Sequence, residues 1–150
     1  MNIRVVLIRG IPGSGKTTIA QMFVNMGFAL VEADQYPEFW ESGSYYFKPE
    51  AVAKAHEWCF EQYKSILEMS TDTGVVVANT FVNLHHMEPY ISYCKERNIA
   101  YHILISDMRN LSVHRVPVST MRRMIENFEF SPWQDVLTNV RKLRAIAKGE

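Results

Sequence analysis

Short, continuous apolar runs take turns along the chain with segments in which apolar residues recur at helical spacing. This pattern predicts strands separated by helices. Four short, mostly apolar runs rich in β-branched residues have the character of buried strands. They cover residues 3–9, 28–32, 75–79 and 99–105. Strands that alternate with helices predict an α/β fold with a parallel sheet and right-handed crossovers. We expect the core order 2-3-1-4, with helices on both faces of the sheet.

Apolar residues recur at helical spacing between these runs. The first helix is expected to end near Gly27, which stands where a C-cap glycine belongs. Its apolar positions are Ile19, Met22, Phe23 and Met26. Further helices are predicted over residues 49–70, 84–97 and 118–128, and from Ser131 onward.

Two segments show no apolar period. Residues 106–117 form a polar, basic connector. Residues 35–48 form a long loop punctuated by glycine, and a loop of that length in a compact domain usually serves a function. Its aromatic residues are Tyr36, Phe39, Trp40, Tyr45, Tyr46 and Phe47.

The segment from Gly10 to Thr17 fits the phosphate-binding pattern G-x-x-x-x-G-K-[ST], the Walker A motif or P-loop. It lies between a predicted strand and a predicted helix, as that motif requires, so the sequence predicts binding of a nucleoside triphosphate. Lys16 is expected to reach the β- and γ-phosphates and the Thr17 hydroxyl to bind Mg²⁺. The expected nucleotide-binding residues are Gly10, Pro12, Gly13, Ser14, Gly15, Lys16, Thr17 and Thr18.

Composition agrees with a single ATP-binding domain over residues 1–150. With 47% hydrophobic and 21% charged residues the chain resembles ordinary globular proteins. Its formal net charge of zero does not indicate nucleic-acid binding, and the basic excess after residue 76 reads as solvated helix faces. The only cysteines, Cys59 and Cys94, lack metal-site spacing and suggest reduced thiols in a cytoplasmic protein. No apolar run approaches membrane-spanning length, and the early first strand leaves no room for a signal peptide.

Motifs beyond the P-loop carry a family resemblance. Asp34 closes the second predicted strand, and the later motifs are Gly43-x-Tyr45-x-Phe47-x-Pro49, Ala55-His56-x-Trp58-Cys59, Val77-Ala78-Asn79-Thr80, Pro89-Tyr90 and Val113-His114-x-Val116-Pro117. This pattern resembles the small ATP-dependent kinases related to the kinase domain of phage polynucleotide kinase. It looks closest to their stand-alone branch with the Ala-His-x-Trp helix. The resemblance implies transfer of the ATP γ-phosphate to a hydroxyl, with a polynucleotide 5′-hydroxyl end as the best-known acceptor.

The resemblance also implies roles for particular side chains. Asp34, at the carboxyl end of a parallel strand, would accept the proton of the attacking hydroxyl. Arg115 and Arg109, in the basic connector, would close as a lid over the triphosphate. Together with Lys16 they would offset the negative charge that develops during phosphate transfer. A capping or loop role is the alternative for Asp34, and solvated lid charges are the alternative for the two arginines. His56 is expected to be structural, with a hydrogen bond in the acceptor cleft as the alternative.

Three positions depart from the family pattern. Active polynucleotide kinases carry an arginine three residues after the aspartate, where this chain has Pro37. The family has an aspartate at the end of the third strand, where this chain reads Ala78-Asn79. Its usual lid arginine is replaced by Leu111.

Three functions are therefore compatible with the sequence. The first is an ATP-dependent kinase acting on a hydroxyl such as a nucleic-acid 5′ end. The second is a kinase for a small molecule or nucleoside, because Pro37 removes a grip on acceptor phosphate and the aromatic loop could stack a ring. The third is a catalytically impaired ATP-binding module that regulates a partner.

Overall fold

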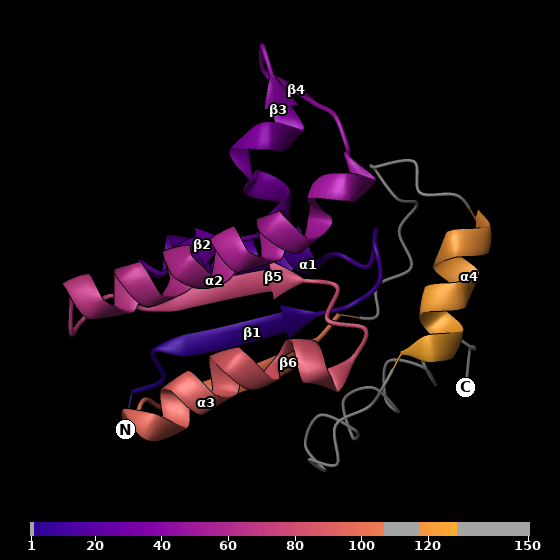
Figure 1. Cartoon of the computed structure of the whole chain (residues 1–150). Helices are drawn as coiled ribbons and strands as arrows, with labels where there is room; N and C mark the ends of the chain where they lie inside the picture. Colours follow the sequence, from indigo (N-terminus) through magenta and orange to yellow (C-terminus); the bar gives the residue numbers. More distant parts are fainter. Residues whose placement is uncertain (1, 107–117, 129–150) are drawn as a thin grey trace.

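A central parallel sheet organises the computed structural model, which describes residues 2–106 and 118–128 (Figure 1). Within these residues the four strands lie in the order β2-β5-β1-β6. If only these four strands are numbered along the chain, β5 is the third and β6 the fourth, and the order is the predicted 2-3-1-4. All the pairings in this sheet are parallel. The strands are β1 (Val5–Arg9), β2 (Ala29–Val31), β5 (Val75–Asn79) and β6 (Tyr101–Ile105).

Helices cover both faces of this sheet. The α-helices of the described residues are α1 (Lys16–Asn25), α2 (Val52–Met69), α3 (Glu88–Glu96) and α4 (Val118–Asn127). Short 3₁₀ turns are η1 (Ala33–Gln35), η2 (Pro37–Phe39), η3 (Pro49–Ala51) and η4 (Leu84–His86). The predicted helices at 49–70 and 84–97 thus each begin with a 3₁₀ turn. In this part of the chain no helix has the length and apolar character needed to cross a membrane.

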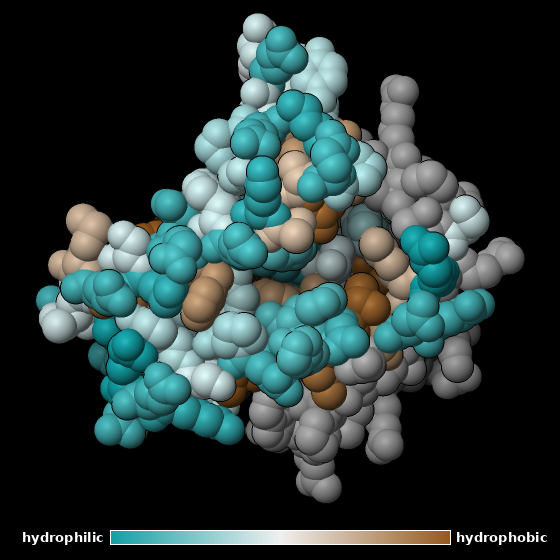
Figure 2. All heavy atoms as spheres, in the orientation of Figure 1, coloured by the Kyte–Doolittle hydropathy of each residue, from teal (hydrophilic) through white to brown (hydrophobic). Residues whose placement is uncertain are grey.

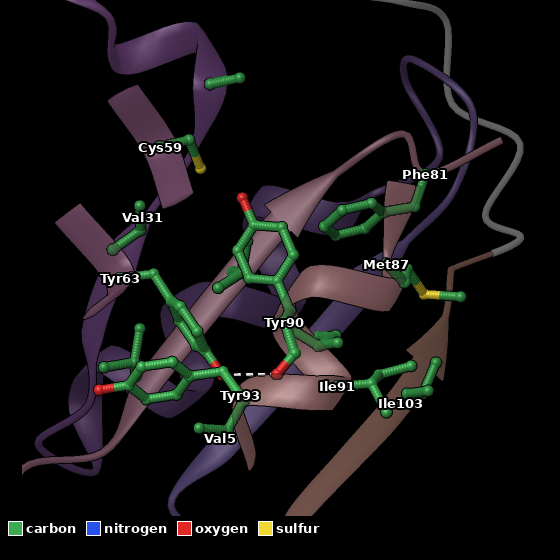
Figure 3. Packing of buried hydrophobic residues seen from close by; sticks show 14 of the residues in the cluster. Val5, Val31, Cys59, Tyr63, Phe81, Met87, Tyr90, Ile91, Tyr93 and Ile103 are labelled. Atoms are coloured by element: carbon green, nitrogen blue, oxygen red, sulfur yellow. Dashed lines mark hydrogen bonds between the residues drawn. The ribbon is translucent and has the colours of Figure 1, made fainter. Parts of the chain in front are cut away.

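The two faces of the sheet bury two separate clusters of side chains. Alternate residues of β1 and β5 point to opposite sides, as the period of a strand requires. Val5 and Leu7 face the larger cluster under α2 and α3, whereas Val6 and Ile8 face α1. The larger cluster is rich in aromatic rings (Figure 3), and within it the Tyr63 hydroxyl donates to the Tyr90 carbonyl at 3.0 Å. Burying the apolar strands on both faces is the main stabilising contribution to the fold.

Two expectations about local structure were wrong. Ile19 and Phe23 of the predicted α1 face pack toward the sheet, but Met22 and Met26 are 64% and 71% exposed, and Ala20 and Val24 complete the buried face. Gly27 has a φ of 99°, in agreement with its expected place after the helix end. The segment 35–48 is also more ordered than a loop.

That segment contains a small antiparallel hairpin. Strands β3 (Trp40–Glu41) and β4 (Ser44–Tyr45) pair with Trp40 opposite Tyr45. The turn residues Ser42 and Gly43 have φ of 51° and 81°, the left-handed pair that suits a two-residue hairpin turn. The hairpin stands away from the main sheet beyond the start of α2 (Figure 1). The predicted helix from Ser131 lies outside the described residues.

Arg9, the last residue of β1, is fully buried. Its guanidinium donates through Nε and Nη2 to the Phe81 carbonyl at 3.0 and 2.6 Å, and Nη2 also reaches the Val82 carbonyl at 3.2 Å. The Phe128 ring lies 4.2 Å from the guanidinium carbon. Arg9 therefore joins β1, the turn after β5 and the residue that follows α4.

We predict that Arg9→Met lowers the free energy of unfolding by about 3 kcal/mol, because it leaves the buried Phe81 carbonyl and the partly buried Val82 carbonyl without their charged donor. Arg97→Met is the matched control. Arg97 is exposed, with Glu96 as an ion-pair partner and the Tyr93 ring 3.7 Å from its guanidinium, and exposed contacts of these kinds should cost about 1 kcal/mol when lost. Urea unfolding of both variants measures the difference, and equal midpoints would contradict the structural role of Arg9.

Candidate functional site

The loop between β1 and α1 has the backbone shape of a phosphate-binding loop. Gly13 and Gly15 have φ of 78° and 94°, in the left-handed region that favours glycine. Helix α1 begins at Lys16 and has no acidic residue in its own first turn, so the positive end of its dipole faces the loop. These features fit a polyphosphate. The other predicted binding residues lie in the same loop and turn, namely Gly10, Pro12, Ser14, Thr17 and Thr18.

The loop is held in place by both neighbouring strands. A Cβ on Gly10 would lie 2.5 Å from Ser14 Oγ and 2.6 Å from the Ser106 carbonyl oxygen, so only glycine fits there. Ser106, directly after β6, donates its hydroxyl to the Ser14 carbonyl. The Gly10 amide donates to the carbonyl of Thr80, directly after β5, at 3.1 Å. Contacts with the residues that follow β5 and β6 therefore hold the loop in its shape.

Lys16 lies over the loop, with its Nζ donating to the Ile11 carbonyl at 2.9 Å. Burial lowers the pKa of Lys16 to about 8, although the carboxylates of Asp34 and Glu32 act in the opposite direction. The ammonium group thus sits between the phosphate-binding loop and two acidic side chains. An anion bound in the loop would favour its charged form.

Glu32 is a site residue that the sequence analysis missed. Its Oε1 accepts a hydrogen bond from the Thr17 hydroxyl at 3.3 Å. Burial, and then the nearby charge of Asp34, raises the pKa of Glu32, whereas Thr17 and Lys16 lower it. The spacing of Glu32 and Asp34 was the available signal, because residues two apart at the end of a strand point to one side.

Asp34 lies in η1, directly after β2, and both strands of the hairpin contact it. The Tyr45 hydroxyl donates to Asp34 Oδ1 at 3.1 Å, and Trp40 Nε1 donates to the Asp34 carbonyl at 2.8 Å. Burial, and then Asp34, raises the pKa of Tyr45, so this phenol stays protonated and donates at neutral pH. The carboxylate is exposed, in agreement with the position expected for a group that meets substrate.

Asn79 positions the segment that carries both acids. Its side-chain oxygen accepts from the Ala33 amide at 2.9 Å, and its Nδ2 lies 3.5 Å from Cys59 Sγ. Asn79 is buried, and both ends of its amide are engaged. Asn79 therefore fixes the backbone at the end of β2. A carboxylate beside Thr17 comes from Glu32.

Two histidines meet beside this edge of the sheet, although they come from different elements. The rings of His56 on α2 and His86 on η4 are stacked, with centroids 6.5 Å apart. Burial, and then His86, lowers the pKa of His56, whereas Asp34 raises it. His85 turns elsewhere and pairs with Glu88 at 3.0 Å. The structural role expected for His56 stays a prediction, since its ring is partly exposed and lies within range of Asp34.

The remaining candidates are divided between the described and undescribed parts of the chain. Pro37 is exposed in η2, three residues after Asp34. Arg109, Leu111 and Arg115 lie outside the described residues. Among the described residues, no group of three or more His, Cys, Asp or Glu side chains could hold a metal ion by itself. Cys59 and Cys94 are buried and free.

Comparisons with known proteins place the fold. No family model matches the chain. It is 25% identical over 138 residues to NEDD4-binding protein 2 of Homo sapiens, a match that covers 83% of this chain but only 8% of that protein. This chain therefore spans a small fraction of its curated relative.

Solved structures give the broader likeness. A chain of the Pnkp1/Rnl/Hen1 complex matches with a TM-score of 0.55 and 17% identity, covering 87% of this chain and 41% of that one. A gluconokinase from Sinorhizobium meliloti 1021 matches with a TM-score of 0.51 and 17% identity over 84% and 75% of the two chains. The Mycobacterium tuberculosis APS kinase CysC matches with a TM-score of 0.50 and 14% identity over 85% and 98%.

The class of protein follows from these findings together with the sheet order. The chain has the α/β fold of the P-loop kinases, with the first strand in the interior of a parallel sheet and helices on both faces. The likeness to two small-molecule kinases and to a chain of the Pnkp1/Rnl/Hen1 complex is one of fold.

We predict that ATP affinity falls about tenfold between about pH 7 and pH 9, because Lys16 loses its proton through this range. The sign follows from its pKa of about 8: below it the ammonium is present to bind phosphate, and above it the neutral amine is not. Calorimetry at several pH values measures the slope. Lys16→Met should bind weakly with no slope, and Lys64→Met should keep the parent slope. A pH-independent parent would contradict the role of Lys16.

Proposed function

We propose that this chain is an ATP-dependent kinase that transfers the γ-phosphate to a hydroxyl acceptor, and that it belongs with the stand-alone Ala-His-x-Trp relatives of polynucleotide kinase. One observation carries the proposal. A P-loop lysine and threonine meet two carboxylates from the end of the neighbouring strand, with Lys16 acted on by both Asp34 and Glu32. A nucleotide site and a candidate base thus lie together at the carboxyl ends of neighbouring strands.

The residues of the loop fit the triphosphate of ATP and its magnesium ion. The amides from Gly13 to Thr17 and the Lys16 ammonium would hold phosphate oxygens. The Thr17 hydroxyl and the Glu32 carboxylate lie 3.3 Å apart and are oxygen ligands of the kind that Mg²⁺ prefers. When bound, Mg²⁺ would offset negative charge on the phosphates during transfer.

Asp34 would take the proton of the acceptor hydroxyl. Its carboxylate is exposed on the side of the sheet that carries Lys16, and Tyr45 holds one of its oxygens by a hydrogen bond. The second oxygen, Oδ2, is the one we assign to the incoming hydroxyl. The attacking oxygen then gains its bond to phosphorus as its proton passes to the carboxylate and the bond to ADP breaks.

The lid remains part of the proposal. Arg115 and Arg109 would supply positive charge to the transferred phosphate in place of the arginine that Leu111 replaces. Both arginines lie outside the described residues, so this assignment rests on the sequence.

We predict that Glu32→Gln removes most of the effect of magnesium on nucleotide binding. The parent should bind ATP about five- to tenfold more tightly with Mg²⁺ than with a chelator present, and the variant should show less than about twofold. Glu61→Gln, an exposed change on α2, is the matched control. Calorimetry with and without Mg²⁺ compares the three proteins, and an unchanged magnesium effect in Glu32→Gln would remove this carboxylate from the metal site.

We further predict that Asp34→Asn lowers phosphate transfer about 100-fold or more while leaving ATP affinity within about twofold, because the amide cannot accept the proton. Asp72→Asn, at the opposite end of the sheet, is the matched control with full activity. Transfer from γ-labelled ATP is measured to a set of hydroxyl acceptors: a 5′-hydroxyl oligonucleotide, ribonucleosides and sugars.

The result of that assay separates the kinase from the regulatory module. Transfer to any acceptor that depends on Asp34 supports the kinase. Tight ATP binding without transfer to any member of the set favours a catalytically impaired, ATP-binding regulator. Transfer that survives Asp34→Asn would show that another group acts as the base.

A further inference from the structure

The hairpin β3–β4 is attached to the proposed base rather than to the sheet. Figure 1 shows it projecting from the body of the molecule between β2 and α2. Phe39, directly before it, is 2% exposed and anchors it in the core. From there the hairpin returns to Asp34 twice, through Trp40 on one strand and Tyr45 on the other. These two hydrogen bonds couple the position of the hairpin to that of Asp34.

Aromatic rings remain exposed around this attachment. Trp40, Tyr46 and Phe47 are 48%, 54% and 58% exposed, although the Phe47 ring also packs on the anchor Phe39 with centroids 5.9 Å apart. Trp40 and its cross-strand partner Tyr45 form an edge-to-face pair with centroids 5.4 Å apart. About half of the indole thus stays open beside the Asp34 backbone. In Figure 2 this region is the projection at the top of the surface.

Most of the charged residues on this segment are acidic, since residues 34–50 carry Asp34, Glu38, Glu41 and Glu50 against Lys48. Burial, and then Glu38 and Glu57, raises the pKa of Tyr36, and Asp34 is the charge that acts on Tyr45. His56 faces Asp34 and His86, and its lowered pKa leaves it uncharged at neutral pH. The exposed Pro37 adds no charge. Such a surface repels the phosphates of a polynucleotide and accepts an uncharged ligand.

We propose that the hairpin is the acceptor site and that the acceptor is an uncharged nucleoside whose base stacks on Trp40. The planar base matches the open indole, and stacking of this kind is tolerant of base identity. The ribose attached to the base would bring its hydroxyl toward Asp34, because the indole nitrogen lies 2.8 Å from the Asp34 carbonyl. This inference rests on the proposed kinase function and names its substrate class.

Binding of adenosine, cytidine and a 5′-hydroxyl oligonucleotide to the full chain tests the proposal. Calorimetry with a non-hydrolysable ATP analogue present gives the affinities. We expect both nucleosides to bind more tightly than the oligonucleotide at about 0.15 M salt. Tighter binding of the oligonucleotide would overturn the proposal and point to a polynucleotide end.

Two changes at one position test the stacking itself. Trp40→Leu should weaken nucleoside binding about tenfold or more, whereas Trp40→Phe, which keeps an aromatic face, should stay within about threefold of the parent. Nucleosides should quench the tryptophan fluorescence of the parent, and that quenching should be lost in Trp40→Phe although binding remains. Equal affinities of Trp40→Leu and the parent would overturn the proposal.

The binding measurements, combined with the phosphate-transfer assay, distinguish the nucleoside site from the proposed kinase function. Nucleoside binding that depends on Trp40 but leads to no transfer would support the acceptor site and contradict the kinase. Transfer to an acceptor that is unaffected by Trp40→Leu would support the kinase and overturn the acceptor site. Asp34→Asn should keep the Trp40-dependent binding and lose the transfer.

Discussion

The hydrogen bond from the Ala33 amide to the Asn79 side chain ties the end of β2 to the end of β5. Ala33 stands between Glu32 and Asp34, so this one bond of 2.9 Å fixes the backbone that carries both acids. Because β5 pairs with β1, whose end begins the P-loop, the acids and the phosphate-binding loop share one reference frame. The neutral amide at Asn79 is suited to this task, since it donates as well as accepts. The candidate site therefore depends on a residue that need not touch substrate.

The sequence predicted the sheet well because its two central strands, β1 and β5, are buried along their whole length. Val75–Asn79 was delimited correctly from its apolar run alone, since both faces of that strand are covered. The P-loop pattern then fixed which strand leads into which helix. The face of α1 was less predictable. Met22 and Met26 satisfy the helical period with Ile19 and Phe23 as well as Ala20 and Val24 do, and only packing against the sheet distinguishes the two pairs.

The candidate site was predicted only in part, because some of its residues belong to local motifs and others are placed by tertiary contacts. Lys16, Thr17 and Asp34 belong to motifs, and the structure brings them to one edge of the sheet, although their roles stay predictions. Glu32 belongs to none of the motifs used above, and its contacts with the Thr17 hydroxyl and, in a capping box, with Gln35 appear only in the structure. The hairpin was hidden because its strands are two residues long, too short for an alternating pattern. Its attachment to Asp34 depends on tertiary contacts that no local pattern encodes.

The central place of β1 has a consequence for how the chain folds. This strand of residues 5–9 pairs with residues 75–79 on one side and 101–105 on the other. Among the four strands of this sheet it is synthesised first, yet it has no partner until β5 follows and lacks its second neighbour until β6 follows. Contacts so distant in sequence make folding slow, and an unpaired apolar strand is prone to aggregate. Of these strands, the one that ends in the P-loop is thus left without its partners for the longest time during synthesis.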